Sequence, residues 1–440
     1  MKIVNISTQT LGECKIDSPI KNTIESFIED SDSVITRLHK EEVLHGIAND
    51  ELKFFEIAGP REKVYFDSNI TCGIVTCGGL CPGINNVIRG IVIELSKKYG
   101  VKNILGFRYG YRGITSKSEF PPMILNPENV DDIHTRGGTV LGSSRGQQDL
   151  EDMVQTLLKY NVKILFTIGG DGTIRGAAEL AKYILSKNLD ISVVAIPKTI
   201  DNDILCVDKS FGFETAVQEA AKIIESAHEE AKGAPNGIGL VKLMGRESGF
   251  IAAYTTLANI NVNYCLIPER KLRLTGENGF LDTLQKRLKN KKHAVILVAE
   301  GVGQDLFFQN SELYNRMDTE KDASGNLKLK DIGLYLKAEI KKYFEEIKME
   351  VNIKYFDPSY SVRSVPANAM DAAYCIILAQ SAVHAGMAGK TNMLVSYINN
   401  HYVYIPIAMA IKDQKRINPN GRIWHTVLES TLQPSEIFYE

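Results

Sequence analysis

The sequence predicts an α/β protein with two Rossmann-like domains, each containing a mainly parallel sheet sandwiched by helices. Apolar runs of strand length alternate with longer helical stretches through most of the 440 residues. This alternation is typical of parallel sheets with helices on both faces. A chain of this length is also large enough for two domains rather than one.

The expected strands are short apolar runs bounded by turn residues. In chain order they are Ile70–Thr76, Asn103–Phe107, Lys163–Ile168, Ile191–Ile196, Ile238–Leu243, Asn263–Ile267, Ala294–Ala299, Met393–Ile398 and Tyr402–Ile405. Helix-like stretches between them include Ile84–Lys98, Thr215–Ala231, Phe250–Asn259 and Ala367–Gly386. Ligands of such sheets bind beyond the carboxyl ends of the strands, so motifs that follow strands are the candidate site.

Two segments depart from this alternation. Residues before about Phe66 carry no glycine-rich motif, so residues 1–66 are expected to form an N-terminal extension. The polar stretch Asp305–Lys330 is expected to be an exposed loop.

Composition excludes several functional classes. The formal net charge is −2, so no basic excess indicates nucleic-acid binding. The sequence has no run of about 20 apolar residues, the length needed to span a membrane. Met1–Thr10 is too polar for a signal peptide. Seven scattered cysteines fit a reducing cytoplasm. Cys72, Cys77 and Cys81 lack a nearby fourth metal ligand, so we expect them to line a strand and a turn.

The segment Gly169–Thr173 reads Gly-Gly-Asp-Gly-Thr and follows an apolar run directly. Glycines there let backbone N–H groups approach a phosphate, and Asp171 is a hard oxygen ligand for Mg²⁺. The motif predicts a nucleotide phosphate site. It does not name the acceptor, because lipid kinases and NAD kinases carry a similar sequence.

A second glycine-rich turn, Gly78–Gly83, lies between an expected strand and an expected helix. This arrangement can bind anions, although many α/β turns have glycines only for packing. The turn lacks the lysine of a Walker A loop. Arg145 ends the segment Leu-Gly-Ser-Ser-Arg and could hold a phosphoryl oxygen, or could be a solvated surface residue.

The segment Pro197–Asp203 presents two carboxylates, Asp201 and Asp203, after another apolar run. A carboxylate beside an acceptor hydroxyl can take its proton during phosphoryl transfer. Asp-Asn-Asp can also be turn chemistry, but the preceding Pro-Lys-Thr-Ile favours a catalytic interpretation.

The motifs together resemble those of the 6-phosphofructokinase family, from about Ile70 to about Ile411. They occur in the order Gly-Gly-Leu-Cys-Pro-Gly, Leu-Gly-Ser-Ser-Arg, Gly-Gly-Asp-Gly-Thr, Pro-Lys-Thr-Ile-Asp-Asn-Asp, Met-Gly-Arg, Ala-Glu-Gly and Asp-Pro-Ser-Tyr-Ser-Val-Arg. The resemblance implies transfer of a phosphoryl group to the 1-hydroxyl of fructose 6-phosphate, in a cleft between two domains. It also implies Mg²⁺ and a homo-oligomer, either a dimer or a tetramer, with sites shared across an interface.

The resemblance assigns roles residue by residue. Asp201 is the expected base and Asp171 the expected Mg²⁺ carboxylate. The other expected catalytic residues are Gly79, Arg145, Thr199 and Arg246. The expected ATP-binding set is Gly78, Gly79, Arg108, Arg145, Gly170, Asp171, Gly172, Thr173 and Lys198. The expected sugar-phosphate set is Thr199, Asp201, Asp203, Met244, Gly245, Arg246, Glu300, Lys354, Tyr360 and Arg363, with Lys354 at a basic position that neighbouring subunits contribute.

The resemblance also sets the expected domain boundaries. The nucleotide and Mg-phosphate domain comprises residues 67–212, completed by about 363–412. The fructose 6-phosphate domain comprises residues 213–362, completed by about 413–440.

The phosphoryl donor is the open question at this stage. Gly172 favours ATP, because pyrophosphate-dependent members carry an aspartate there whose charge would repel the α-phosphate. Lys198 favours pyrophosphate, since the pyrophosphate-dependent members have lysine where the short ATP-dependent enzymes have glycine. Tyr360 also matches the pyrophosphate-dependent and long ATP-dependent members, since the short enzymes have histidine. We weigh Gly172 more heavily, because a lysine need not exclude ATP.

A pyrophosphate-dependent enzyme remains the alternative. Two less favoured alternatives are another kinase with the Gly-Gly-Asp-Gly motif and a non-catalytic regulatory subunit. The later motifs disfavour another kinase. The presence of both Asp171 and Asp201 disfavours a non-catalytic subunit.

Overall fold

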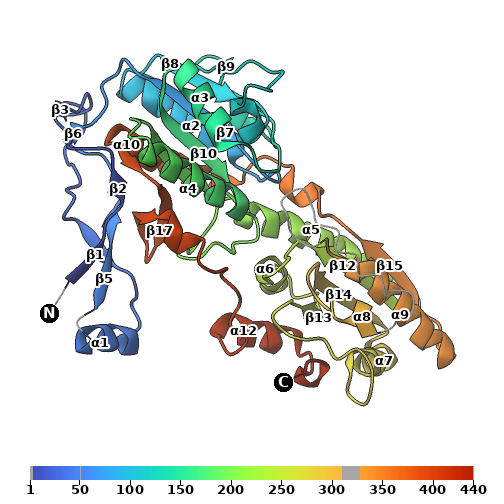
Figure 1. Ribbon diagram of the computed structural model, residues 1–440. Coiled ribbons are helices and arrows are strands. Elements are labelled where there is room, and N and C mark those ends of the chain that lie inside the picture. The colour runs from blue at the N-terminus through green and yellow to red at the C-terminus, as the bar shows by residue number, and fades with distance from the viewer. Residues whose placement is uncertain (1–2, 50, 310–327, 440) are drawn as a thin grey trace. The chain divides into compact units, whose positions relative to one another are not determined.

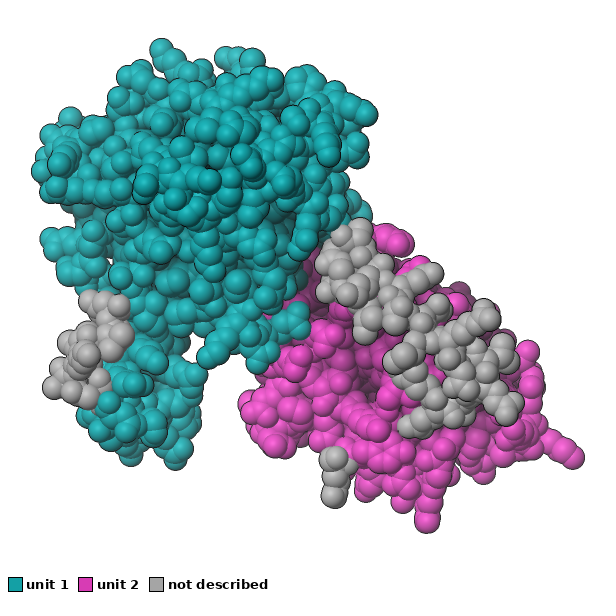
Figure 2. Space-filling model, viewed as in Figure 1, with its two compact units in different colours: residues 1–199, 204–212, 364–414 teal, residues 200–203, 213–363, 415–440 magenta. Residues whose placement is uncertain are grey.

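The computed structural model describes residues 3–49, 51–309 and 328–439. The chain divides into two compact units (Figure 2). Unit 1 comprises residues 1–199, 204–212 and 364–414. Unit 2 comprises residues 200–203, 213–363 and 415–440.

In the described residues of unit 1, ten strands form one mixed sheet. Its order is β1 (Ile3–Ile6), β5 (Leu52–Ile57), β18 (His401–Pro406), β17 (Met393–Ile398), β11 (Ser192–Pro197), β10 (Val162–Gly169), β7 (Thr71–Thr76), β8 (Asn103–Phe107) and β9 (Met123–Ile124), with β4 (Ser33–Ile35) beside β5. The central strands β17, β11, β10, β7 and β8 are parallel, as the sequence predicts.

The last two strands of the sheet in chain order, β17 and β18, add an antiparallel pairing to this mainly parallel sheet. β17 and β18 form an antiparallel hairpin in which Ile398 pairs with His401. Its two-residue turn consists of Asn399 and Asn400, whose φ angles are 49° and 66°. A two-residue hairpin turn of type I′ needs positive φ at both positions, and asparagine adopts this conformation more readily than most residues.

Helices cover both faces of the central strands (Figure 1). Leu165 of β10 belongs to a buried cluster with Ile174 of α4. Its neighbours Ile164 and Phe166 point to the other face, where a Cβ at Gly386 of α10 would lie 2.8 Å and 3.3 Å from their side chains. The helices of unit 1 are α1 (Lys40–Ala48), α2 (Ile84–Ile93), α3 (Leu150–Lys159), α4 (Asp171–Ser186), α10 (Ala369–Met387) and α11 (Ile407–Ala410).

Residues before Phe66 contribute strands to unit 1. Besides β1, β4 and β5, two short ladders tie this region down. They are β2 (Gln9–Thr10) with β16 (Lys390–Thr391), and β3 (Ile16–Asp17) with β6 (Lys63–Val64).

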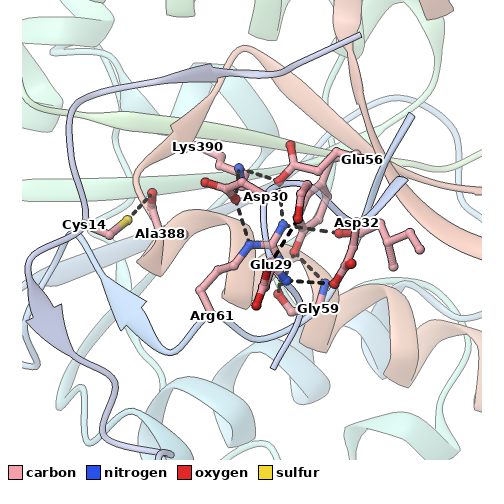
Figure 3. Close-up of polar contacts among 12 residues, drawn as sticks. Cys14, Glu29, Asp30, Asp32, Glu56, Gly59, Arg61, Ala388 and Lys390 are labelled. Atoms are coloured by element: carbon pink, nitrogen blue, oxygen red, sulfur yellow. Dashed lines mark hydrogen bonds and ion pairs between the residues drawn. The ribbon is translucent and has the colours of Figure 1, made fainter. Parts of the chain in front are cut away.

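An ion cluster joins the same region to β16 (Figure 3). Arg61, Glu56 and Lys390 are 7%, 7% and 4% exposed. Glu56 accepts from the Arg61 guanidinium and lies 2.5 Å from Lys390 Nζ. Asp30 accepts from Arg61 Nε at 3.0 Å and lies 3.4 Å from Lys390 Nζ. Two carboxylates thus compensate two cations that have lost most of their contact with water.

Unit 2 contains a sheet of parallel strands with the order β13 (Tyr264–Leu266), β14 (His293–Ala299), β12 (Gly237–Leu243) and β15 (Asn352–Phe356). Its helices are α5 (Phe213–Lys232), α6 (Phe250–Ala258), α7 (Phe280–Lys291), α8 (Leu306–Gln309), α9 (Ile332–Glu346) and α12 (Arg422–Thr431). No helix among the described residues is long and apolar enough to cross a membrane.

The stretch Asp305–Lys330 is described only at its two ends. Its first residues correct the expectation of an exposed loop, because Leu306 and Phe307 begin α8 and are each 7% exposed. Their apolar side chains favour burial over solvent. Residues 310–327 lie outside the described residues.

Candidate active site

The glycine-rich motifs of unit 1 lie at one edge of its sheet. β7, β10 and β11 are parallel neighbours, and Thr76 aligns with Ile168 and Gly169 with Pro197. The three strands therefore end together. The turns that follow them meet at the carboxyl edge, where α/β sheets bind ligands.

The turn after β7 requires its glycines. Gly78 and Gly83 have φ angles of 85° and 100°, which L side chains rarely adopt. A Cβ at Gly83 would also lie 2.6 Å from the Cys375 sulfur. Ser143 Oγ donates to the Gly78 carbonyl at 2.6 Å and fixes the turn from the neighbouring loop.

Lys198 has a role in this turn. It is 5% exposed at the end of β11, and its Nζ donates to the Gly79 carbonyl at 2.7 Å. The ammonium thereby joins β11 to the turn after β7. This function of Lys198 does not depend on the donor, which weakens its value as a sign of pyrophosphate use.

The second glycine motif forms the start of α4. Gly170 is the N-cap and Asp171 the first helical residue, so unpaired N–H groups and the positive end of the helix dipole are available to an anion. A Cβ at Gly172 would meet nothing within 4 Å, whereas Thr173 is buried. The Asp171 carboxylate is 39% exposed and accepts from Arg175 Nε at 2.9 Å.

Two arginines of the expected ATP set come from neighbouring loops. Arg108 follows β8, and its guanidinium lies over the Tyr109 and Phe120 rings at 5.4 Å and 5.0 Å. Arg145 is exposed. Its neighbour Ser144 accepts from Gly78 N at 3.0 Å and donates through Oγ to Tyr109 O. These bonds place Arg145 beside the first glycine turn.

The motifs of unit 2 also lie at a carboxyl edge of a sheet. β12 and β14 end as neighbours, and the Glu300 and Gly301 amides donate to the Leu243 and Gly245 carbonyls at 2.9 Å and 3.0 Å. A Cβ at Gly301 would lie 1.8 Å from Arg246 O, so only glycine fits. The Met-Gly-Arg and Ala-Glu-Gly motifs are therefore side by side.

Glu300 is surrounded by positive charge. Burial raises the pKa of its carboxyl, while the charges of Lys242, Arg246 and Arg363 lower it. Arg363 follows β15 and lies 4.9 Å from the centre of the Tyr360 ring, which is 74% exposed. Lys242 is itself paired with Asp331 and Asp357. A carboxylate beside two arginines suits a ligand with hydroxyl donors and an anionic group.

The segment with the two candidate acids is held through two of its backbone carbonyls, which accept hydrogen bonds from other residues of unit 2. Ser248 Oγ donates to the Asp201 carbonyl at 3.2 Å, and Lys415 N donates to the Asp203 carbonyl at 2.7 Å. Asp201 thus lies beside the loop that follows β12. Thr199 belongs to unit 1, where its carbonyl accepts from Ser210 Oγ at 2.7 Å.

Lys354 is not at this edge. It lies in the middle of β15 opposite Gly239, and its Nζ is 3.9 Å from Glu230 Oε2 of α5. Within one chain, the structure does not bring Lys354 to the other expected sugar-phosphate residues.

The sequence analysis assigned no role to three charged residues at the unit 2 edge, although each left a signal. Lys242 is a lysine within an otherwise apolar strand, and it pairs with Asp331 and Asp357. Asp331 precedes an apolar helix as an N-cap should. Asp357 begins the Asp-Pro-Ser-Tyr motif.

The clustered cysteines behave as core residues. Cys72, Cys77 and Cys81 are buried and form no disulfide, and burial raises the pKa of Cys77 to about 12. Such thiols stay protonated and unreactive near neutral pH.

Known proteins match both the sequence and the fold. A family model described as phosphofructokinase matches residues 71–386. The ATP-dependent 6-phosphofructokinase of Borreliella burgdorferi is 48% identical over 98% of this chain and 97% of its own length. That of Amycolatopsis methanolica is 44% identical over 98% and 95%. ATP-dependent 6-phosphofructokinase 7 of Arabidopsis thaliana is 50% identical over 87% and 77%.

Solved structures show the same fold at much lower identity. The pyrophosphate-dependent phosphofructokinase of Marinobacter aquaeolei gives a TM-score of 0.64 at 15% identity, covering 83% of this chain and 92% of that one. The sequence relatives and the family model together cover both units. The chain therefore belongs to the phosphofructokinase family.

Proposed function

We propose that this chain is an ATP-dependent 6-phosphofructokinase, which transfers the γ-phosphoryl group of ATP to the 1-hydroxyl of fructose 6-phosphate and yields fructose 1,6-bisphosphate. The observation that carries the proposal is identity of 44–50% with ATP-dependent relatives over most of the chain. The open space at Gly172 supports the same donor, because among the described residues no atom lies within 4 Å of a Cβ placed there.

The donor phosphates bind at the unit 1 edge in this proposal. The backbone N–H groups of the two glycine turns and the start of α4 hold phosphate oxygens. Arg145 and Arg108 add positive charge, which stabilises the transferring group. Lys198 keeps the first turn in place through its bond to Gly79.

Mg²⁺ is part of the proposal. Within the described ranges, no group of three or more His, Cys, Asp or Glu side chains could hold a metal ion. Asp171 nonetheless offers one partly exposed carboxylate at the anion-binding end of α4. Kinases bind Mg²⁺ through one or two carboxylates together with substrate phosphates and water, so this single carboxylate fits. The metal would neutralise charge on the donor oxygens.

The acceptor sugar binds at the unit 2 edge. Arg363 and Arg246 hold the anionic part of the ligand, and Glu300 accepts from sugar hydroxyls. Asp201 takes the proton of the 1-hydroxyl as the bond to phosphorus forms. Asp203, Thr199 and the Met244–Gly245 backbone complete the surroundings of the reacting oxygen.

Two further features belong to the proposal. None of the seven cysteines forms a disulfide, which fits a cytoplasmic enzyme. Lys354 acts on the fructose 6-phosphate site of a neighbouring chain in a homo-oligomer. Mixing impaired Lys354→Ala and Asp201→Asn chains should then regenerate activity in hybrid assemblies, and a reassembled mixture no more active than its parents would contradict the shared site.

The function is tested by offering the purified chain fructose 6-phosphate with Mg²⁺ and either ATP or pyrophosphate. We expect fructose 1,6-bisphosphate with ATP, and a specificity constant for ATP far above that for pyrophosphate. The Asp201→Asn chain, assayed in parallel, excludes contaminating activity. Preference for pyrophosphate would overturn the donor assignment. Absence of product with both donors would overturn the function.

A further inference from the structure

Lys242 is a buried lysine at the end of β12, two residues before Met244. It is 8% exposed, and its Nζ lies 2.7 Å from Asp331 Oδ2 and 2.9 Å from Asp357 Oδ2. Its strand neighbours Val241 and Leu243 are fully buried apolar residues. A buried ion pair is seldom more stabilising than well-packed apolar side chains. Stability alone therefore does not explain why a lysine, rather than an apolar residue, occupies position 242.

The two aspartates belong to separate segments. Asp331 is the N-cap of α9 and accepts from Leu334 N at 3.0 Å. Asp357 opens the segment after β15 that carries Tyr360 and Arg363, and it accepts from Ser359 N at 3.3 Å. One ammonium thus fixes both the start of α9 and the start of the Arg363 segment to the end of β12.

A glutamine bridge connects the start of α9 to the third loop of this edge. Gln304 Nε2 donates to the Glu300 and Lys330 carbonyls, each at 3.1 Å. Gln304 Oε1 accepts from Lys330 N at 3.0 Å. Because Lys330 precedes Asp331, the Glu300 loop is linked through α9 to Lys242.

We propose that Lys242 is a positioning residue for fructose 6-phosphate, holding the Arg363 segment in register with the Met244–Arg246 and Glu300 loops. The inference rests on the proposed function, which places the sugar phosphate among these loops. Lys242 itself need not touch the ligand. Its ammonium acts through Asp357, which sets where the chain leaves β15. It also adds to the positive charge that surrounds Glu300.

The proposal predicts a selective loss of acceptor affinity. Lys242→Met keeps the length and apolar stem of the side chain but removes the tether. A displacement of about 1 Å at a binding group can cost about 100-fold. We therefore expect the KM for fructose 6-phosphate to rise about 10- to 100-fold, with kcat and the KM for ATP within about 3-fold of wild type.

The chain provides a matched control in unit 1. Lys390 is also a buried lysine between two carboxylates, Glu56 and Asp30. Lys390→Met removes a buried ion pair from unit 1, whereas Arg246, Glu300 and Arg363 belong to unit 2. It should lower Tm as Lys242→Met does, yet leave the KM for fructose 6-phosphate unchanged. A loss caused only by a broken buried ion pair would appear in both variants.

A triple variant separates the loss of the tether between segments from the effect of leaving two carboxylates without their cation. Combining Lys242→Met with Asp331→Asn and Asp357→Asn removes the carboxylates left unpaired, while asparagine still caps α9. Tm should recover and the KM for fructose 6-phosphate should stay high. If Lys242→Met does not fold, Asp357→Asn alone provides the test, because it releases the Arg363 segment but keeps Lys242 paired with Asp331.

The outcomes distinguish the two proposals. An active wild type with an unchanged KM for fructose 6-phosphate in Lys242→Met overturns the positioning role only. So does full recovery of that KM in the triple variant, or an equal rise in the Lys390→Met control. A wild type inactive with fructose 6-phosphate overturns the proposed function itself, and the positioning role with it.

Discussion

Gly172→Asp should convert the donor preference of this chain without harming its fold. A Cβ at Gly172 meets nothing within 4 Å, and its φ lies outside the left-handed region. Replacing glycine by aspartate inside a helix gains about 0.3 kcal/mol, because aspartate is itself a weak helix former. A carboxylate in the first turn of α4 gains a further ~0.3–1 kcal/mol from the helix dipole. The variant should therefore have a Tm equal to or above that of wild type.

The same carboxylate should exclude ATP. It would face the α-phosphate of the nucleotide, and two like charges about 4 Å apart at an effective dielectric near 20 repel by roughly 4 kcal/mol. That energy corresponds to about a thousandfold in affinity. Pyrophosphate lacks the third phosphate and the nucleoside, so it avoids this repulsion.

The assay is the ratio of specificity constants for ATP and pyrophosphate, with fructose 6-phosphate saturating. Gly172→Asn is the matched control, because its side chain has nearly the same size and no charge. We expect the ratio to fall at least tenfold further in Gly172→Asp than in Gly172→Asn. Equal effects would refute the electrostatic explanation. An unchanged ratio in both variants would refute the placement of the α-phosphate. A large fall in Tm would refute the reasoning about the fold.

Three further predictions concern single side chains. Asp201→Asn should lower kcat by about 10²–10⁴-fold with the KM for fructose 6-phosphate within a few-fold, and retention of a tenth of wild-type turnover would remove its role as base. Asp171→Ala should raise the Mg²⁺ concentration needed for half-maximal rate at fixed ATP, and an unchanged metal titration would argue against the carboxylate. His384 Nδ1 forms a hydrogen bond of 2.7 Å with the Tyr99 hydroxyl, and burial lowers the pKa of His384 to about 4. Between pH 6.5 and about 4 the unfolded chain therefore binds the extra proton, so stability falls as pH falls, by at most about 3 kcal/mol. His384→Asn should flatten that slope in denaturant titrations, and parallel slopes would contradict the burial of a neutral imidazole.

The sequence located the central strands and the loops after them because both signals are local. Each of these strands is a short apolar run, and each phosphate or sugar motif directly follows one. The strand β18 was predicted, but its antiparallel direction was not assigned, although Asn399 and Asn400 lie between two apolar runs at hairpin spacing. Most of the strands before Phe66 were not predicted because they have only two to four residues, and β2 and β5 each have a partner far along the chain. β5, for example, pairs with β18 through Glu56 and Tyr404.

Lys242 shows why part of the site could not be predicted. A lysine in an apolar strand conflicts with local rules, and its partners are separated from it by intervening elements of unit 2. Only the tertiary structure shows that Asp331 and Asp357 converge on one ammonium. The role of Lys354 is a different case, because the resemblance assigns it to a neighbouring subunit and a single chain cannot test that role.

The pairing of β5 with β18 has a consequence for synthesis on the ribosome. The partners Ile57 and Val403 are separated by roughly 350 residues, which take roughly 20–70 s to translate at typical rates. All of residues 213–363 of unit 2 emerge during that interval. Throughout it, β5 lacks its β18 neighbour at Glu56 and Ile57, and β11 lacks its β17 neighbour. Unpaired strand edges promote association between chains. Chains stalled before β17 and β18 should therefore aggregate through unit 1, while the parallel sheet of unit 2 already has all of its strands.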